Sequence, residues 1–402
     1  MTAEMQKDAV LRYMELLQAT RVMEREIDVV YSDPEIEDPD EMTAEAQANV
    51  ETARDVIAEQ KPLVEAIIQE QISAVLADEG FGFRGQLIPP VLMHSSPLPS
   101  LLVVSPRDEI NRDYSVVLKT DVETPERAEI EAGIYEDLDL SAYVTNIGGI
   151  AFYPAMIQET TSLQFFIDVV AHEWSHVWFD TRPLGYRYSL DGDVRIINES
   201  SASIFGEEIA LLVLARYYPE FLPAEPDEIV DATPVPTPTP DPNVPPPFDF
   251  RAEMGETRIR VDELLEEGKV DEAEAYMEER RQVFVANGYN LRVLNQAYFA
   301  FHGAYAQNGG GAAGTNPIGP LVRDIYEASP SMRAFMDRIG QVGSYEDLLE
   351  TADSMGLALP SDEPDTPEIP TDMLSCVAQG GVWEKEGASL YTCTLAIEDG
   401  GE

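Results

Sequence analysis

Five consecutive residues, His172-Glu173-Trp174-Ser175-His176, carry the residue types best suited to chemistry in this chain. The protein has only four histidines, so two of them at this spacing with an acid between them are hard to explain by chance. On a helix, positions i and i+4 share one face, and both imidazoles can bind one zinc ion. Glu173 is then placed to act as general base toward a water on that ion. The motif predicts a zinc-dependent hydrolase.

The residues around this motif have the periodicity of a buried amphipathic helix. Apolar residues recur at three- and four-residue steps from Leu163 to Trp178, and Ser162 is placed to cap the helix. The two histidines lie on an adjoining face. Asp168 and Asp180, one turn before and one turn after them, are candidates to orient an imidazole. A solvated acid near a helix end explains each aspartate more simply.

A catalytic zinc site usually has three protein ligands, so a third ligand is expected from a second helix packed on the first. The best candidate is Glu199, which follows His176 after 22 intervening residues. Three small residues share its helical face, Ala202, Ser203 and Gly206. Small residues allow two helices to approach closely enough for a short carboxylate to reach the metal. Glu207 and Glu208 point away from that face and are the alternative ligands.

The HEWSH motif and the following Asn198-Glu199-Ser200-Ser201-Ala202 together resemble the gluzincin metallopeptidases, in which a helical glutamate is the third zinc ligand. More narrowly, the chain is similar to a bacterial group of predicted zinc aminopeptidases with HExxH, NESxA and a later Leu-Asn-x-Ala. That last motif is Leu294-Asn295-Gln296-Ala297 here, so the resemblance covers about residues 145–310. It implies a thermolysin-like core, zinc bound by His172, His176 and Glu199, and a peptide substrate.

The resemblance leaves endopeptidase and aminopeptidase action open. No glycine-rich exopeptidase motif of the GAMEN type lies upstream of the zinc motif. Ser203 stands four residues after Glu199, where thermolysin-like enzymes have an aspartate. Two other functions also fit the motif: a zinc-binding surface scaffold or adhesion protein without catalysis, and a metallohydrolase that acts on non-peptide substrates such as esters.

Hydrolysis at a metal also needs a donor that stabilises the tetrahedral oxyanion. Residues 288–306 have a helical pattern, and one flank of this helix carries polar and aromatic side chains. His302 and Tyr298 are the candidates for catalysis, with Tyr305 behind them. A buried, hydrogen-bonded stripe that only supports the helix is the alternative. Two tyrosines between the ligand helices are rival donors, Tyr186 and Tyr188.

Residues Ile147 to Pro154 predict a short strand that ends at a proline before the metal helix. Gluzincins use an edge strand at this place to hydrogen-bond the extended substrate, and the resemblance implies the same role here. Gly148 and Gly149 would allow a peptide backbone to approach closely. A plain turn before a strand explains the two glycines equally well.

The elements around the motif divide the chain into segments. Residues 1–90 predict an N-terminal helical region, a hairpin of helices over 3–30 and 43–79 joined by an acidic loop. Residues 91–222 predict the core, with both zinc-binding helices and a small sheet. The predicted strands are Leu101–Val104 and Tyr114–Thr120.

Beyond this core, residues 223–250 are rich in proline and predict an irregular insertion. Residues 251–357 predict a C-terminal helical lobe of the catalytic domain, where a long charged pattern breaks at Glu267-Gly268-Lys269. Residues 358–372 predict an acidic, proline-rich linker, and residues 373–402 a cysteine hairpin module. The predicted fold class is therefore α+β and mostly helical.

The two cysteines, Cys376 and Cys393, have no histidine near them, which argues against a metal knuckle. Gly380-Gly381 predicts a hairpin of Cys376–Val382 with Ser389–Thr394, stapled by a disulfide. The Cys-x3-Gly-Gly-x-Trp spacing resembles a small cysteine module of bacterial putative hemolysins and secreted proteins. A disulfide indicates an oxidising compartment. We therefore expect a secreted or cell-surface protein whose leader has been removed, because the sequence shows no signal peptide.

The net charge and the length of the chain indicate which partners and what size of core to expect. The formal net charge of −49 predicts repulsion of nucleic acids and anionic membranes. The acids are spread along the chain, so a solvated surface, as in adaptation to high salt, explains them better than a preference for cationic peptides. A chain of 402 residues with 44% hydrophobic content can bury a substantial core. We expect a monomer whose partner is a peptide or protein substrate.

Overall fold

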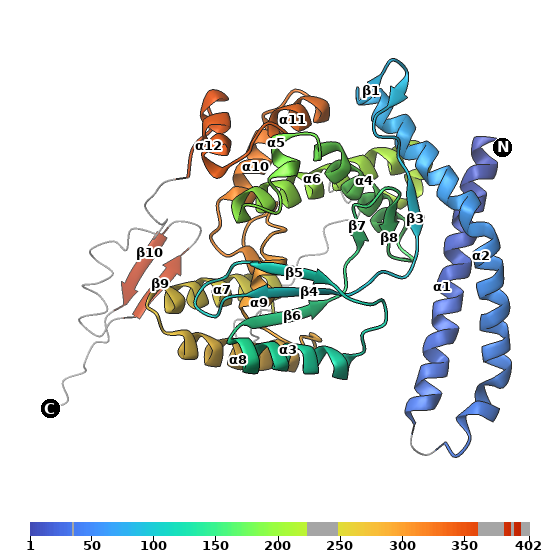
Figure 1. The fold of residues 1–402 in the computed structure, drawn as a ribbon, viewed down its shortest axis with the longest axis horizontal. Coiled ribbons are helices and arrows are strands. Elements are labelled where there is room, and N and C mark those ends of the chain that lie inside the picture. Colours follow the sequence, from blue (N-terminus) through green and yellow to red (C-terminus); the bar gives the residue numbers. More distant parts are fainter. Residues whose placement is uncertain (34–35, 223–247, 361–381, 387–389, 395–402) are drawn as a thin grey trace. The chain divides into compact units, whose positions relative to one another are not determined.

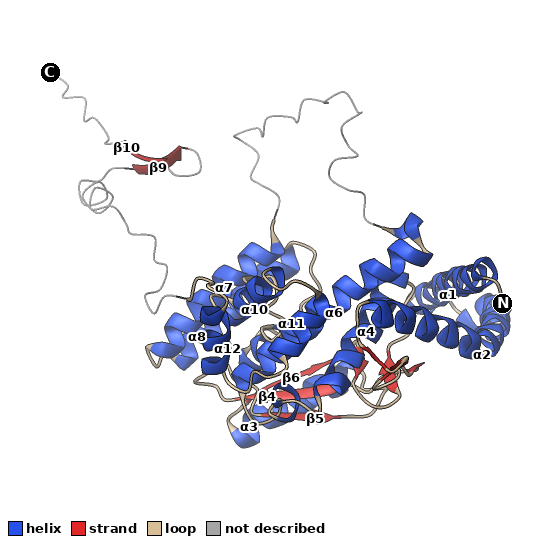
Figure 2. Cartoon of the chain, turned by 90° about the horizontal axis from the view of Figure 1, so that it is seen from above, coloured by secondary structure: helices blue, strands red, loops and turns tan. Residues whose placement is uncertain are grey.

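A computed structural model describes residues 1–33, 36–222, 248–360, 382–386 and 390–394 of the protein. The chain divides into two compact units, Met1–Leu357 and Ala358–Glu402. Helices make up most of the first unit, and its strands form small sheets (Figures 1 and 2). The fold is therefore α+β and mostly helical, as predicted. Within the described residues, none of the helices is long and apolar enough to cross a membrane.

Two long helices begin the chain and lie side by side, α1 (Ala3–Ser32) and α2 (Pro39–Asp78) (Figure 1). The Thr2 side chain caps α1, and the Asp38 side chain caps α2 by accepting a hydrogen bond from the Glu41 amide. Proline directly after this cap favours a helix start. Both predicted helices are confirmed, and α2 begins four residues earlier than predicted because Asp38 and Pro39 start it.

Phe81, just after α2, joins this helical region to the core. Its ring lies edge-on to three aromatic rings at centroid distances of 5.6, 5.9 and 5.5 Å, those of Trp174, Trp178 and Phe205. The indole of Trp174 also donates a hydrogen bond to the Pro89 carbonyl. The aromatic contacts and this hydrogen bond hold the chain after α2 against the helices that carry the metal motif and Glu199.

One three-stranded antiparallel sheet has the order β5-β4-β6. Its strands are β4 (Leu101–Ser105), β5 (Tyr114–Val117) and β6 (Ser141–Thr145). Helix α3 (Thr124–Leu138) covers one face through Ile130 and Ile134, and Val103 on the other face packs with Ala297 and Phe301. The two predicted strands are confirmed, although β5 ends three residues before the predicted end at Thr120, whereas β6 and α3 were not predicted.

A second small sheet has the order β3-β8-β7 and places β7 at its edge. Its strands are β3 (Met93–Ser95), β7 (Gly149–Ile150) and β8 (Ala155–Ile157). The predicted strand from Ile147 to Pro154 is therefore too long. The amide of Phe152 donates to the Ile150 carbonyl at 2.7 Å, so the chain turns after Ile150 and returns as β8. A two-residue hairpin also pairs β1 (Gly82–Phe83) with β2 (Gln86–Leu87).

The metal motif lies in α4 (Leu163–Phe179), and Glu199 lies in α6 (Gly192–Tyr217). Short helical turns flank α6, α5 (Pro183–Tyr186) before it and η1 (Pro219–Phe221) after it. The Ser162 hydroxyl caps α4 as predicted, and the Asp191 carboxylate caps α6.

The helices after the proline-rich segment belong to the same unit as the core. They are α7 (Phe250–Glu266), α8 (Val270–Ala286), α9 (Gln296–His302), η3 (Gly311–Ala313), α10 (Ile318–Glu327), α11 (Met332–Ile339) and α12 (Tyr345–Ser354). The predicted break at Glu267-Gly268-Lys269 is confirmed. The helix predicted over residues 288–306 is wrong in length, because Asn295 caps its start and the chain leaves the helix at Gly303.

In the second unit, β9 (Val382–Glu386) pairs antiparallel with β10 (Leu390–Thr394), with Trp383 opposite Cys393. The prediction of a hairpin is confirmed, but its first strand begins at Val382, where the predicted strand Cys376–Val382 ended. Cys376 and the predicted disulfide lie outside the described residues. So do residues 223–247 of the predicted insertion and residues 361–372 of the predicted acidic linker.

Candidate metal centre

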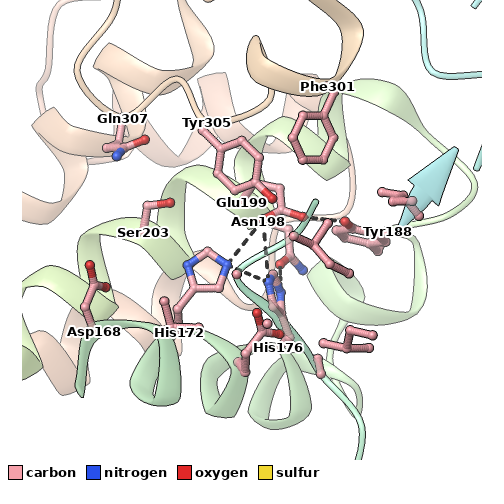
Figure 3. Close-up of a pocket in the computed structure, with 18 of the residues that line it drawn as sticks. Asp168, His172, His176, Tyr188, Asn198, Glu199, Ser203, Phe301, Tyr305 and Gln307 are labelled. Atoms are coloured by element: carbon pink, nitrogen blue, oxygen red, sulfur yellow. Dashed lines mark hydrogen bonds and ion pairs between the residues drawn. The ribbon is translucent and has the colours of Figure 1, made fainter. Parts of the chain in front are cut away.

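Helices α4 and α6 pack against each other and bring the motif histidines to Glu199 (Figure 3). The small residues of α6 make this close packing possible. Ala202 is fully buried, and a β-carbon on Gly206 would lie 3.2 Å from the β-carbon of His172 and closer still to Asp168. A larger side chain at position 206 would push the two helices apart. The predicted stripe of small residues therefore faces α4.

His172, His176 and Glu199 form one cluster whose potential ligand atoms all lie within 4.8 Å of one another. The two Nε2 atoms are 3.0 Å apart, and Oε2 of Glu199 lies 3.4 Å from Nε2 of His172 and 3.6 Å from Nε2 of His176. Ligand atoms at ordinary zinc bond lengths and tetrahedral angles are about 3.4 Å apart. The three side chains thus fit one metal ion.

The alternative ligands, Glu207 and Glu208, do not belong to this cluster. Glu207 lies near Arg323, with 3.5 Å between its Oε2 and the guanidinium Nη2. Glu208 interacts with Tyr326. Of the three acids, only Glu199 lies within reach of both histidines, although Glu207 lines the same cavity.

Oε2 of Glu199 carries the strongest indication that a cation belongs here. The Glu199 side chain is buried, and Oε2 makes no hydrogen bond to any described residue. Burial by itself would raise the pKa of Glu199, but the charges of the two neighbouring imidazoles outweigh burial and hold the pKa well below its usual value. A buried carboxylate oxygen without a hydrogen bond is costly unless a cation compensates it.

Asn198 orients His176 from the residue next to the third ligand. Its Oδ1 lies 2.7 Å from Nδ1 of His176, and its Nδ2 donates to the Leu184 carbonyl at 3.1 Å. Since the amide nitrogen is held by the carbonyl, Oδ1 accepts the proton from Nδ1 and leaves Nε2 free for a metal. The sequence interpretation missed this residue, although its position beside Glu199 could have suggested it.

The two aspartates considered for that role do not perform it. Among the described residues, no hydrogen bond joins the Asp168 or Asp180 carboxylate to either imidazole. Asp168 instead packs beside Gly206, and burial raises its pKa to about 6 although nearby His172 opposes the shift. Asp180 follows the end of α4, and its amide donates to the His176 carbonyl.

Glu173 lies in the same cavity as the cluster and is only 7% exposed. Its side chain packs directly against Gly149 of strand β7, where a β-carbon would lie 2.7 Å from Cγ of Glu173. Burial raises its pKa above the usual value, against the opposing effect of the two histidines. A raised pKa suits a carboxylate that must accept a proton and return it.

A cavity of about 830 Å³ opens at the cluster. Helices α4 and α6 line one part of it, and residues of β4, β5, β7 and α9, together with neighbouring loops, line the remainder. Apolar lining residues include Leu101, Val117, Ile150, Phe165 and Phe301. The cavity therefore joins a metal-ligand wall made of helices to a mixed wall made of strands and loops, and it is large enough for several residues of a peptide.

The structure places the two expected oxyanion donors outside this cavity. The rings of Tyr298 and His302 lie 4.3 Å apart between centroids with an angle of 43° between their planes, and Nε2 of His302 lies 3.4 Å from the Tyr143 hydroxyl. Burial lowers the pKa of His302 to about 4, so its imidazole is neutral near pH 7. This pair supports the packing of α9 against β6, which is the alternative considered from sequence.

Tyr305 and Tyr188 occupy the positions beside the cluster instead (Figure 3). The Tyr305 ring lies 6.3 Å from the His172 ring, and the Tyr188 ring lies 6.0 Å from the His176 ring. The other rival donor, Tyr186, is 62% exposed and does not line the cavity. Sequence reasoning had ranked Tyr305 behind Tyr298 and His302, and the early end of α9 at His302 explains the difference.

Comparison with family models, with curated proteins and with solved structures found no match for this chain. The geometry of the cluster and its cavity therefore carries the functional argument. What it establishes directly is a buried group of two imidazoles and one carboxylate that can hold a metal ion.

Proposed function

We propose that the protein is a zinc-dependent peptidase of the gluzincin type. The observation that carries the proposal is the buried Oε2 of Glu199, which has no hydrogen bond to any residue that the structure describes and lies 3.4 and 3.6 Å from two imidazole nitrogens. His172, His176 and Glu199 would hold the ion. Two imidazoles and one carboxylate leave a fourth position open, which is the ligand pattern of catalytic rather than structural zinc.

Zinc at this position would supply the Lewis acidity that activates a water and polarises a substrate carbonyl. Glu173 would act as general base beside it. Its carboxylate takes a proton from the attacking water and then passes that proton to the nitrogen of the departing amine. Burial of Glu173 against Gly149 favours this role, because it raises the pKa and fixes the direction of the side chain.

Strand β7 would hold the peptide substrate. It is the edge strand of its sheet, pairs with β8 on one side, and contributes both of its residues to the cavity lining. An extended peptide can add to such an edge through main-chain hydrogen bonds. Gly149 has no side chain, which leaves room for Glu173 beside this strand. Tyr305 would donate a hydrogen bond from its hydroxyl to the oxyanion of the tetrahedral intermediate.

The test of peptidase activity is Glu173→Gln, assayed on a library of short peptides after zinc loading. We expect loss of turnover by several orders of magnitude with zinc content unchanged, because the amide cannot accept the proton. Glu208→Gln is the matched control, since Glu208 lies outside the cavity. Turnover of esters but not of peptides by the wild-type protein would favour a non-peptide hydrolase. Zinc binding without turnover of either class would favour a scaffold or adhesion role.

A further inference from the structure

Two residues from loops distant in sequence connect to the third metal ligand. Tyr188, between α5 and α6, contacts Oε1 of Glu199 through its hydroxyl. Arg112, between β4 and β5, donates from Nη2 to the same hydroxyl at 3.2 Å. A chain of hydrogen bonds thus runs from Arg112 through Tyr188 to Glu199.

The direction of this chain follows from the chemistry of its members. A guanidinium has only donors, so the Tyr188 oxygen must accept from Arg112. The hydroxyl proton is then directed toward Oε1 of Glu199.

The two oxygens of Glu199 consequently have different environments. Oε1 accepts the hydrogen bond of Tyr188, whereas Oε2 makes none within the described chain and faces both imidazoles. An oxygen that already accepts a charge-assisted hydrogen bond is a poorer metal ligand than one that accepts none. The hydrogen bond therefore selects which oxygen is offered to a cation.

Packing around Tyr188 keeps this arrangement in place. The guanidinium carbons of Arg112 and Arg195 lie 5.7 and 5.9 Å from the centre of its ring. Arg195, in the first turns of α6, also donates to the main-chain oxygen of Arg112 at 3.3 Å. Helix α6 thus holds the loop that carries Arg112, and that loop in turn orients Glu199 of the same helix.

We infer that Arg112 and Tyr188 are positioning residues that restrict Glu199 to binding the metal through one oxygen, Oε2. This inference rests on the metal site of the proposed function but not on peptidase activity. Neither residue is required to touch the substrate for this role. Arg112 acts only through Tyr188, so the two residues form one functional unit.

The first test is zinc affinity, measured by competition with a chelator, in Tyr188→Phe. We expect a 10- to 100-fold loss, the usual cost of removing a hydrogen bond to a metal ligand. The matched control is Tyr186→Phe, two residues earlier in the chain and 62% exposed, which should bind zinc like the wild type. Wild-type affinity in Tyr188→Phe would overturn the inference.

A double-mutant cycle then tests whether the two residues act as one unit. Arg112→Met should weaken zinc binding less than Tyr188→Phe does, and adding it to Tyr188→Phe should cause little further loss. Independent effects that multiply in the double variant would contradict the relay. Arg112→Met alone still decides the question if Tyr188→Phe does not fold, because unchanged zinc affinity in a folded Arg112→Met protein would overturn the role of Arg112.

The second readout is the visible spectrum of the cobalt-substituted protein, which depends on coordination number. Loss of the Tyr188 hydroxyl frees Oε1 to join the metal, so Tyr188→Phe should show weaker visible absorption than the wild type and Tyr186→Phe. An unchanged spectrum would contradict control of the binding mode. Wild-type protein that binds zinc but cleaves no peptide would overturn only the peptidase proposal, whereas wild type that binds no metal would overturn both.

Discussion

The two walls of the cavity are built differently. The wall that carries His172, His176 and Glu199 consists of two long helices whose small residues pack closely at Gly206. The rest of the lining comes from short strands such as β7 and β5, from Phe301 of α9 and from loops, and it forms the second wall. A helix fixes the relative positions of side chains three or four residues apart, whereas a loop does not. The first wall is thus suited to holding an ion, and under the proposed function the second would receive the substrate.

The largest expected effect tests the division of roles between the walls. Tyr305→Phe should lower kcat by about 100- to 1000-fold, the usual effect of losing one oxyanion donor. Its zinc content should stay unchanged, because the loop wall does not bind the ion. Tyr298→Phe is the control and should lower kcat by less than about threefold, since this residue packs against Tyr143 outside the cavity. Equal losses in both variants would contradict the assignment of Tyr305.

The buried Asp168 carboxylate should make the stability of the helix wall depend on pH. Folding raises the pKa of Asp168 from 3.8 to about 6, so its ionised form destabilises the metal-free fold above pH 6. Asp168→Asn should therefore be more stable than the wild type at pH 8, by at most about 3 kcal/mol. The difference should shrink as the pH falls through 6 and vanish below pH 4. Chemical denaturation of the metal-free proteins measures it, and a difference that does not change with pH would contradict the prediction.

Two substitutions in and beside the helix wall test whether Asn198, and not Asp180, orients His176. Asn198→Ala should weaken zinc binding by about 10- to 100-fold, because His176 loses the partner that fixes its Nδ1 proton. Asp180→Asn removes a charge near the same helix end without removing a hydrogen bond to an imidazole, so its zinc affinity should stay within about threefold of the wild type. Chelator competition measures both, and a larger effect at Asp180 would reverse the assignment.

The pH dependence of zinc binding tests the coupling between His176 and Glu199. Burial lowers the pKa of His176, but the charge of Glu199 outweighs it and raises the value to about 9 in the metal-free protein. Zinc must then displace a proton from His176, so its apparent affinity should rise about tenfold per pH unit between pH 7 and 9. Calorimetry in two buffers with different ionisation enthalpies should show release of about one proton at pH 7. Binding without proton release would contradict the coupling.

One wall is made of helices and the other of short strands and loops, and this difference explains which features could be predicted from the sequence. The metal cluster follows from positions within helices, since i and i+4 place both histidines on one face and the small residues after Glu199 mark the contact face. The Ser162 cap also follows from local sequence. Each of these depends on neighbours in the chain, and helical geometry converts them into positions in space.

The loop wall could not be predicted in the same way. The choice of His302 and Tyr298 over Tyr305 assumed a helix through residue 306, but Asn295 and Gly303 shorten that helix and move Tyr305 into the cavity wall. These two residues are recognisable helix boundary signals and were underweighted. Arg112 has no such signal, because its contact with Tyr188 joins loops 76 residues apart.

The most direct test of the central claim is zinc stoichiometry by elemental analysis of the wild type and Glu199→Ala, purified identically. Glu208→Ala, a change of the same kind on the same helix, serves as the control. We predict one zinc per chain in the wild type and in Glu208→Ala, and loss or strong weakening of zinc binding in Glu199→Ala. Full zinc content in Glu199→Ala, or no zinc in the wild type after reconstitution, would contradict the three-ligand metal centre.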